Sequence, residues 1–207
     1  MNVSAEKFIR SNLRIEPARL LPEISLYTAH PGSRLSQLIC DTDAPPYWAY
    51  GWGGGTVLAR HILDQPELVR DRRVLDLGCG SGVVGIAAAK AGASHVLASD
   101  IDTNAHAATR LNALLNRVLI DIAEGDLTNG PLPDVELVLA GDLFYDLRTA
   151  AKVLPWLSAC RSAGITVLIG DPFRAHLPVS QLTLIASYDV PDFGTETAGR
   201  AGVFSLP

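Results

Sequence analysis

Closely spaced glycines follow a short apolar run in the first third of the chain. The stretch 74–85 reads Val-Leu-Asp-Leu-Gly-Cys-Gly-Ser-Gly-Val-Val-Gly, in which Gly80, Gly82 and Gly85 satisfy the pattern G-x-G-x-x-G. Asp100 follows Gly80 by twenty residues, at the end of the next apolar run. Such glycines let a backbone approach a nucleotide-like ligand closely, and an acid at this distance is placed for ribose hydroxyls. The spacing predicts a nucleotide-type cofactor site.

The carboxylate of Asp76 favours one class of cofactor. Asp76 stands two residues before Gly78, where it would repel the pyrophosphate of a dinucleotide but attract the amino group of S-adenosylmethionine, directly or through water. A chain of 207 residues also leaves no second domain for the substrate of a dehydrogenase. We therefore expect S-adenosylmethionine as the cofactor and S-adenosylhomocysteine as its product. A nicotinamide-dependent oxidoreductase is the last alternative.

Strands and helices that would position these residues alternate from residue 73 onward. Apolar runs predict five strands, at 74–77, 95–99, 118–123, 136–140 and 165–169. Helical spacing predicts helices between them, at 81–91, 103–116 and 147–160. Two closing runs, 182–190 and 202–206, have no helix between them. This order predicts an α/β fold: a doubly wound, mostly parallel seven-stranded sheet with helices on both faces and a terminal antiparallel hairpin.

The part of the chain before residue 73 is predicted less regularly. A helix is expected at 3–13, a short strand at 23–28, a helical piece at 33–39 and a helix opened by Thr56 that runs to about residue 64. A glycine triplet at 53–55 precedes that last helix, and we expect these glycines to need positive φ. We expect one domain over residues 1–207, with 1–44 as an extension that covers part of the acceptor cleft and 45–207 as the core.

Composition limits the classes of partner and compartment. The formal net charge is −5 with no run of Lys and Arg, which argues against nucleic acid as a partner. The three cysteines are odd in number and form no C-x-x-C pair, so we expect a reducing compartment without disulfides or a metal site. No apolar stretch reaches the roughly 18 residues of a membrane span. Acidic Glu6 and Glu16 argue against a transit peptide, and the expected location is cytoplasmic.

Four separated blocks of sequence resemble one enzyme family. Asp76-Leu-Gly-Cys-Gly-Ser-Gly resembles motif I of the seven-strand (class I) methyltransferases, and Asp142-Leu-Phe-Tyr145-Asp146 resembles the signature of their protein lysine methyltransferases. Pro-Pro-Tyr-Trp-Ala-Tyr-Gly-Trp-Gly-Gly-Gly at 45–55 and Gly-Asp-Pro at 170–172 are similar to those enzymes of the family that act on the β subunit of electron-transfer flavoprotein. The resemblance implies lysine side chains of that subunit as the substrate. The turn at Gly53 departs from it, because the family has a proline there.

The resemblance also implies a role for each candidate cofactor residue. Gly78 and Gly80 would line the methionine moiety, Asp100 would bind the ribose hydroxyls, and Asp126 and Leu127 would contact the adenine amine and ring. Trp52 and Gly141 would lie against the cofactor as well. An ordinary surface turn remains an alternative for Asp126.

Asp142 and Tyr145 are the candidate catalytic residues. Positioning is most of the catalysis of methyl transfer, and the acceptor must lie at the carboxyl ends of parallel strands. Asp142 would attract and align an incoming amine first and accept its proton second, because a carboxylate also raises the pKa of the amine. Tyr145 would hydrogen-bond the amine or line the channel through which the amine enters. Asp146 could instead cap the helix that begins at Leu147.

Other noticeable side chains are expected to be structural. We expect Tyr47, Trp48 and Tyr50 to pack in the core, His61 to be structural and Cys79 not to be a catalytic thiol. The predicted function is methyl transfer to protein lysines. Another protein target, such as a ribosomal protein, a small-molecule amine acceptor and an inactive cofactor-binding module are the alternatives.

Overall fold

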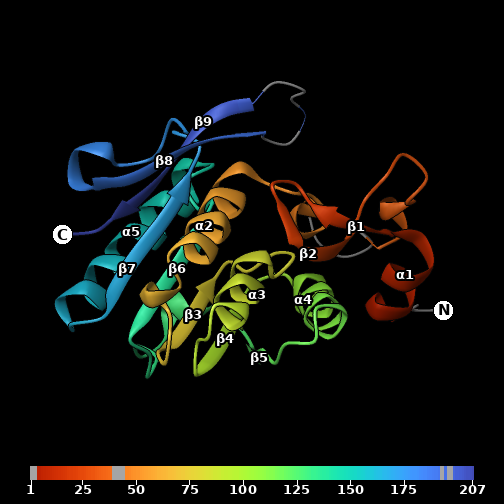
Figure 1. Cartoon of the computed structure of the whole chain (residues 1–207), viewed down its shortest axis with the longest axis horizontal. Coiled ribbons are helices and arrows are strands. Elements are labelled where there is room, and N and C mark those ends of the chain that lie inside the picture. The colour runs from red at the N-terminus through yellow and green to blue at the C-terminus, as the bar shows by residue number, and fades with distance from the viewer. Residues whose placement is uncertain (1–3, 39–44, 192–193, 195–197) are drawn as a thin grey trace.

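The computed structural model describes residues 4–38, 45–191, 194 and 198–207. Within them lies a sheet of seven strands in the order β5-β4-β3-β6-β7-β9-β8 (Figure 1). The strands from β5 to β7 are parallel, and β9 runs antiparallel to β7 and β8. The strands span Arg73–Leu77 (β3), His95–Ser99 (β4), Asp121–Ala123 (β5), Leu137–Gly141 (β6), Thr166–Asp171 (β7), Thr183–Pro191 (β8) and Ala198–Ser205 (β9). The predicted mostly parallel sheet with a terminal hairpin is confirmed.

Central strand β6 shows why helices must cover both faces. Leu137 and Leu139 enter one hydrophobic cluster, whereas Val138 and Ala140 enter a second cluster on the other face. All four residues are buried. Successive side chains of a strand point to opposite faces, so a run that is apolar throughout requires cover on each side.

Helices supply this cover unequally. Two helices, α2 (Gly53–Asp64) and α3 (Val83–Lys90), pack on the first face, with Leu58 fully buried. On the second face the cover comes from α5 (Leu147–Ser162) and from the irregular segment that carries Leu177. The predicted helices on both faces are confirmed.

A smaller unit of N-terminal elements packs on the helices rather than on the sheet itself, to the right of the sheet in Figure 1. It comprises α1 (Ala5–Asn12) and the hairpin of β1 (Arg14–Ala18) and β2 (Leu21–Thr28), which lie against α4 (Thr103–Leu115). Asn112 Oδ1 accepts the N–H of Tyr27 at 2.8 Å, and Asn116 Oδ1 accepts the N–H of Ser25 at 3.0 Å. The two amide side chains thus satisfy backbone groups at the edge of β2 that would otherwise lack partners.

Three elements differ from the prediction. The strand expected at 118–123 is formed only at Asp121–Ala123, and the helical piece expected at 33–39 is a 3₁₀ turn at Leu35–Gln37. Strand β1 was not predicted at all, because it contains Pro17 and four of its five residues are exposed. Without a buried face, the strand leaves no alternation in the sequence to detect.

Helix α2 begins three residues earlier than predicted, and the reason given for its glycines is wrong. The triplet 53–55 is helical and does not appear among the residues with positive φ. What the triplet provides is close approach. A Cβ atom added to Gly54 would lie 2.3 Å from the carbonyl oxygen of Gly170, and one added to Gly141 would lie 2.9 Å from Cα of Gly55. These contacts bring the first turn of α2 directly against the ends of β6 and β7.

Candidate active site

One large cleft collects every residue that the sequence predicts for the site. It has a volume of about 1520 Å³ and opens at the carboxyl ends of β3, β4 and β6. Its lining includes all ten candidates: Trp52, Asp76, Gly78, Gly80, Asp100, Asp126, Leu127, Gly141, Asp142 and Tyr145. N-terminal residues from β1, β2 and the segment after them line it as well. A crevice at the carboxyl ends of parallel strands is where ligands bind in open α/β sheets.

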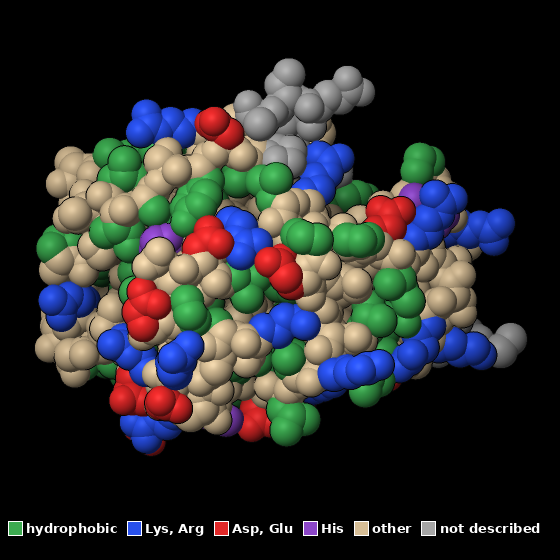
Figure 2. All heavy atoms as spheres, viewed as in Figure 1, with side chains coloured by type: hydrophobic (Ala, Val, Ile, Leu, Met, Phe, Trp, Pro, Cys, Tyr) green, Lys and Arg blue, Asp and Glu red, His purple; other side chains and the backbone are tan. Residues whose placement is uncertain are grey.

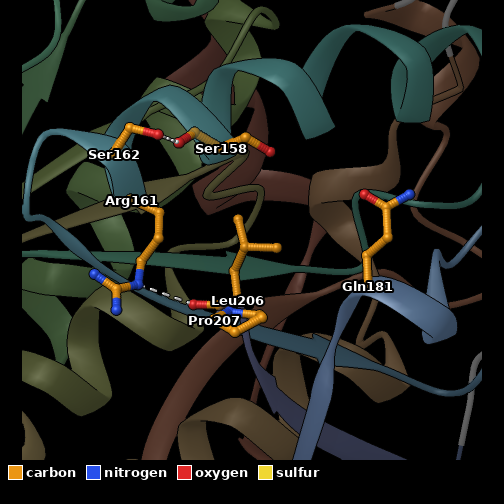
Figure 3. A pocket seen from close by; sticks show the side chains of 6 residues that line it. All are labelled: Ser158, Arg161, Ser162, Gln181, Leu206 and Pro207. Atoms are coloured by element: carbon orange, nitrogen blue, oxygen red, sulfur yellow. Dashed lines mark hydrogen bonds between the residues drawn. The ribbon is translucent and has the colours of Figure 1, made fainter.

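A second hollow, of about 360 Å³, lies between the end of α5 and the end of β9 (Figure 3). Its lining residues are Ser158, Arg161, Ser162, Gln181, Leu206 and Pro207. Arg161 Nε donates to the carbonyl oxygen of Leu206 at 3.1 Å. None of the ten candidate residues reaches this hollow.

The glycine loop after β3 forms the floor of the large cleft. Gly78, Gly80 and Gly82 have φ angles of 66°, 52° and 79°, a region that L-residues with a side chain rarely adopt. A Cβ atom on Gly78 would also lie 2.4 Å from a methyl carbon of Leu143. Backbone atoms therefore face the cleft directly, as a ligand in close contact with them requires.

Asp76 lies beneath this loop and is only 1% exposed. Its Oδ2 accepts the N–H of Gly85, in the first turn of α3, at 2.8 Å. Burial raises the pKa of Asp76 to about 7, and the charge of Asp100 acts in the same direction. A ligand with a positive charge would favour the ionised form of this carboxylate, because it would offset the cost of burial.

Asp100 connects the loops that follow β3 and β4. Oδ2 accepts the N–H of Gly80 at 2.9 Å, and Oδ1 accepts the N–H of Asp102 at 2.9 Å. Burial raises the pKa of Asp100 despite these hydrogen bonds. The two bonds hold its carboxylate at the rim of the cleft, beside the glycine loop.

Asp126 lines the cleft near α5 and is held in place by neighbouring residues. It caps the 3₁₀ turn Leu127–Asn129, accepts hydrogen bonds from Thr128 and forms an ion pair with Lys152 of α5. Burial acts to raise the pKa of Asp126, but Lys152 and Thr128 outweigh it and keep the pKa below the usual range. Leu127 is half-buried beside it and lines the cleft.

Asp142 is the most constrained candidate. It directly follows β6 with a φ of 57°, and its side chain is 11% exposed. Oδ2 accepts the N–H of Gly55 at 2.9 Å, whereas Oδ1 lies 2.9 Å from Nε and 2.8 Å from Nη2 of Arg174. Because Gly55 is the third residue of α2, this carboxylate caps the amino terminus of that helix from another part of the chain.

Three aromatic rings line the same cleft as Asp142. Tyr47 lies edge-on to Trp52, with ring centroids 5.5 Å apart, and 5.4 Å from the ring of Tyr145. Trp52 Nε1 donates to the carbonyl oxygen of Tyr47 at 2.8 Å, and the guanidinium carbon of Arg174 lies 5.7 Å from the centroid of the Trp52 ring. Burial raises the pKa of Tyr145, so its hydroxyl stays protonated.

The expectation of core packing for the upstream aromatics is partly wrong. Trp48 is buried among α1 and α4 as expected, although it also reaches the lining of the cleft. Tyr47 is 40% exposed and lines the cleft. Tyr50 packs against the same cluster as Trp48 and lines the cleft too. The three residues lie in and beside a 3₁₀ turn, and sequence spacing does not reveal which way each ring points from such a turn.

Three further expectations have clear outcomes. Asp146 caps α5 by accepting the N–H of Thr149 at 3.0 Å, which confirms the capping alternative. His61 is buried with Nδ1 3.0 Å from the hydroxyl of Tyr188, so its structural role is confirmed. Burial raises the pKa of Cys79 well above its ordinary value, and a neutral thiol is a weak nucleophile. Cys40 lies outside the described residues.

Sequence reasoning missed Arg174 and gave Asp171 no role of its own. Asp171 ends β7 and is fully buried, and its Oδ1 accepts the N–H of Arg174 at 2.7 Å. Its Oδ2 has no hydrogen-bond partner in the part of the chain that the structure describes. Burial raises the pKa of Asp171 to about 6, and the charge of Asp142 acts in the same direction. Gly-Asp-Pro at 170–172 had marked the place, but nothing in the sequence aims Arg174 at Asp142.

Three structural features bear on ligands and partners. Among the described residues no group of three or more metal-binding side chains occurs, and no helix is long and apolar enough to cross a membrane. Figure 2 shows acidic and basic side chains interspersed over most of one face, with Lys and Arg gathered towards the lower right, where Figure 1 shows α1 and α4. The fold thus brings together basic side chains that form no run in the sequence.

The fold and the cleft together define a class I S-adenosylmethionine-dependent methyltransferase. The residues fit that cofactor, because a backbone cradle of positive-φ glycines lies beside the buried carboxylate of Asp76. A family model described as ribosomal protein L11 methyltransferase (PrmA) matches residues 41–141.

Solved structures support the fold. The ribosomal protein L11 methylase of Lactobacillus delbrueckii subsp. bulgaricus superposes with a TM-score of 0.55 at 23% identity, over 75% of this chain and 79% of that one. The tRNA (uracil-54, C5)-methyltransferase of Pyrococcus abyssi, in complex with S-adenosyl-L-homocysteine, has a TM-score of 0.52 at 17% identity, over 72% of this chain and 38% of that one.

Curated relatives show the family. The electron transfer flavoprotein beta subunit lysine methyltransferase of Xenopus laevis is 45% identical over 153 residues, which are 71% of this chain and 62% of that protein. The chain thus spans less than two thirds of this relative. The enzyme of the same name from Danio rerio is 40% identical over 205 residues, which are 90% of this chain and 76% of that protein. The chain belongs to the family of the electron-transfer flavoprotein β-subunit lysine methyltransferases.

Proposed function

We propose that this protein transfers a methyl group from S-adenosylmethionine to lysine side chains of the β subunit of electron-transfer flavoprotein. The relatives that carry this name support the substrate. The observation that carries the chemistry is the position of Asp142, which directly follows β6 and lines the same cleft as Tyr47, Trp52 and Tyr145. A cleft that is lined by a carboxylate and by aromatic rings suits a cationic or amine acceptor.

The proposed cofactor residues divide the ligand among them. Gly78 and Gly80 would contact the methionine moiety, and Asp76 would attract its amino group. Asp100 would bind the ribose hydroxyls. Asp126, Leu127 and Gly141 would border the rest of the cofactor, with Trp52 closing over it. All of these residues line the one cleft.

The acceptor residues would align an amine for an in-line displacement. The bound cofactor supplies a methyl group on a positively charged sulfur. The lysine nitrogen must be neutral, so its ammonium form, with a pKa of about 10.4, would first lose a proton to solvent. Its lone pair would then form the new N–C bond with the methyl group, and the electron pair of the broken C–S bond would stay on sulfur. Asp142 and Tyr145 would orient the nitrogen during this step.

A ribosomal protein is the second candidate substrate, because the ribosomal protein L11 methyltransferase model matches residues 41–141. A small-molecule amine is a further possibility for the same cleft. The cytoplasmic location, and the absence of nucleic-acid and membrane partners, remain predictions.

Labelling in a cell extract tests the proposal. Extract from cells that lack the protein is incubated with methyl-labelled cofactor and the purified protein, and labelled proteins are identified by mass spectrometry. Purified electron-transfer flavoprotein and ribosomal protein L11 are assayed in parallel. We expect label on lysines of the flavoprotein β subunit. Label only on L11, or only in the small-molecule fraction, would overturn this substrate, and stabilisation of the protein by NAD but not by S-adenosylhomocysteine would overturn the cofactor.

A further inference from the structure

Arg174 holds the carboxylate to which the acceptor amine is assigned. Its Nε and Nη2 atoms lie 2.9 and 2.8 Å from Oδ1 of Asp142, and the side chains of Arg174 and Asp142 are only 22% and 11% exposed. Oδ2 of Asp142 accepts the N–H of Gly55. With little water to screen the pair, the guanidinium and the helix terminus together offset the charge of this carboxylate.

Arg174 is fixed in this position by its neighbours. Its N–H donates to the buried Asp171 at 2.7 Å, and the preceding Phe173 has a φ of 60°, which turns the chain back towards the cleft. Its guanidinium lies against the ring of Trp52. The backbone N–H of Arg174 is thus held by Asp171, and its guanidinium is held by Trp52 and Asp142. A side chain with so many contacts has little freedom and can orient another residue.

The remaining charged groups near the pair are mostly acidic. Among the described residues, Asp171 of β7 interacts electrostatically with both members of the pair. The other titratable groups on the neighbouring elements are Tyr47, Asp76, Asp100, Tyr145 and Asp146, which line the same cleft, and His176, which acts on Asp146. The first turn of α2 contributes backbone N–H groups and no acidic side chain. Arg148 and Lys152 of α5 also line the cleft, and Lys152 pairs with Asp126.

This arrangement matters for an amine that must lose its proton. A carboxylate without a counter-charge would bind a lysine as its ammonium and raise the pKa of that lysine, which would slow attack. A guanidinium on the same carboxylate cancels most of this effect and repels the ammonium form.

Resting on the proposed function, we propose that Arg174 is a positioning residue that acts through Asp142. It fixes the carboxylate that aligns the acceptor lysine and, by balancing its charge, keeps that carboxylate from trapping the lysine as an unreactive ammonium.

The pH dependence of the chemical step tests this role. Single-turnover methylation of electron-transfer flavoprotein is measured from pH 6.5 to 9.5, with enzyme and cofactor saturating. For Arg174→Gln we expect the rising limb of the rate to move alkaline by about one to two pH units, with a loss of about 10- to 100-fold at pH 7 that shrinks as the pH rises. Arg174→Lys should keep the limb within a few tenths of a unit of the unaltered protein.

Two further variants separate charge balance from a merely structural role. Arg60→Gln is the matched control, because Arg60 pairs with Glu23 and Asp64 at 3.0 and 2.8 Å outside the cleft. In Arg60→Gln the rising limb of the pH–rate profile should not move. In Arg174→Gln combined with Asp142→Asn no carboxylate is left to trap the ammonium, so the limb should return to its original position at a lower rate.

The outcomes are distinct. A loss in Arg174→Gln that is equal at every pH, or a limb that stays alkaline in the double variant, would overturn this proposal while the proposed function stands. If Arg174→Gln fails to bind S-adenosylhomocysteine or to melt cooperatively, Arg174→Lys and the double variant decide by the same criteria. An unaltered protein that methylates no lysine would overturn the proposed function, and this proposal with it.

Discussion

Asp142, at the end of β6, caps the first turn of α2 through a 2.9 Å hydrogen bond from the N–H of Gly55. These two residues are 87 positions apart in the chain. The bond gives one carboxylate two tasks, because the group that lines the cleft also stabilises helix α2. Substitutions at Asp142 must therefore be read for stability and for activity separately.

Asp142→Ala should abolish methyl transfer, whereas Asp142→Asn should leave a much lower but measurable rate, and the two variants should also differ in stability. Asn tolerates the left-handed backbone at this position and can still accept the N–H of Gly55, whereas Ala can do neither. We expect a loss in the free energy of unfolding of about 1–2 kcal/mol for Asn and about 3 kcal/mol for Ala. Urea unfolding shows which of the two variants is less stable. The affinity of Asp142→Asn for S-adenosylhomocysteine should change little. Normal methylation by either variant would refute the acceptor assignment.

Gly54→Ala should destabilise the protein, whereas its neighbour Gly55→Ala should not. The new Cβ would lie 2.3 Å from the carbonyl oxygen of Gly170 in the first case but 3.5 Å from a methyl group of Val83 in the second. Overpacking against backbone costs about 1–3 kcal/mol, and Ala in a helix gains up to about 1 kcal/mol over Gly. Thermal melting followed by circular dichroism compares the two variants. Equal melting temperatures would contradict the close packing of α2 on β7.

The ligand-free protein should lose stability as the pH rises from about 5 to 7.5. Burial raises the pKa of Asp76 to about 7 and of Asp171 to about 6. Since both values exceed those of the unfolded chain, the folded state binds more protons in this range, and its stability is present at low pH and lost as the pH passes through the folded values. At 1.36 kcal/mol per pKa unit the loss from Asp76 over this range amounts to about 2–3 kcal/mol. Urea unfolding at pH 5.5, 6.5 and 7.5 measures the slope.

Asp76→Asn is the matched variant for this pH dependence. It should flatten the slope, because Asn carries no charge to desolvate, and it should weaken binding of S-adenosylhomocysteine. In the unaltered protein that binding should tighten from pH 5.5 to 7.5, as Asp76 must ionise to hold an amino group. An affinity that is independent of pH, or a slope that Asp76→Asn leaves unchanged, would count against this role.

Asp100→Ala should weaken cofactor affinity by more than the loss of one ligand contact alone, since it also releases the N–H of Gly80. We expect a dissociation constant for S-adenosylhomocysteine at least 10-fold higher by calorimetry, which corresponds to about 1.4 kcal/mol. Asp121→Ala is a suitable control, because Asp121 is an exposed acid on β5 that lies outside the cleft. A dissociation constant unchanged in Asp100→Ala would refute the ribose assignment.

Local patterns in the sequence were enough to predict the sheet and the glycine loop of the site. Apolar runs of strand length, such as the one in β6, mark strands buried on both faces, and the glycines around Gly80 mark a turn that requires positive φ. Both are local signals, in which a few adjacent residues carry the constraint. For the same reason Asp142 could be placed at the end of a strand, and Asp146 could be recognised as a possible helix cap.

The contacts that these residues make could be found only in the folded chain. Nothing near Arg174 in sequence indicates that its guanidinium reaches Asp142, because the contact depends on a left-handed turn at Phe173 and on the pairing of β6 with β7. The glycines at 53–55 were expected to serve a turn, but they serve packing against Gly141 and Gly170. Contacts between distant segments depend on how the strands pair and how the helices pack on them. Such contacts produce no periodic pattern in a single sequence.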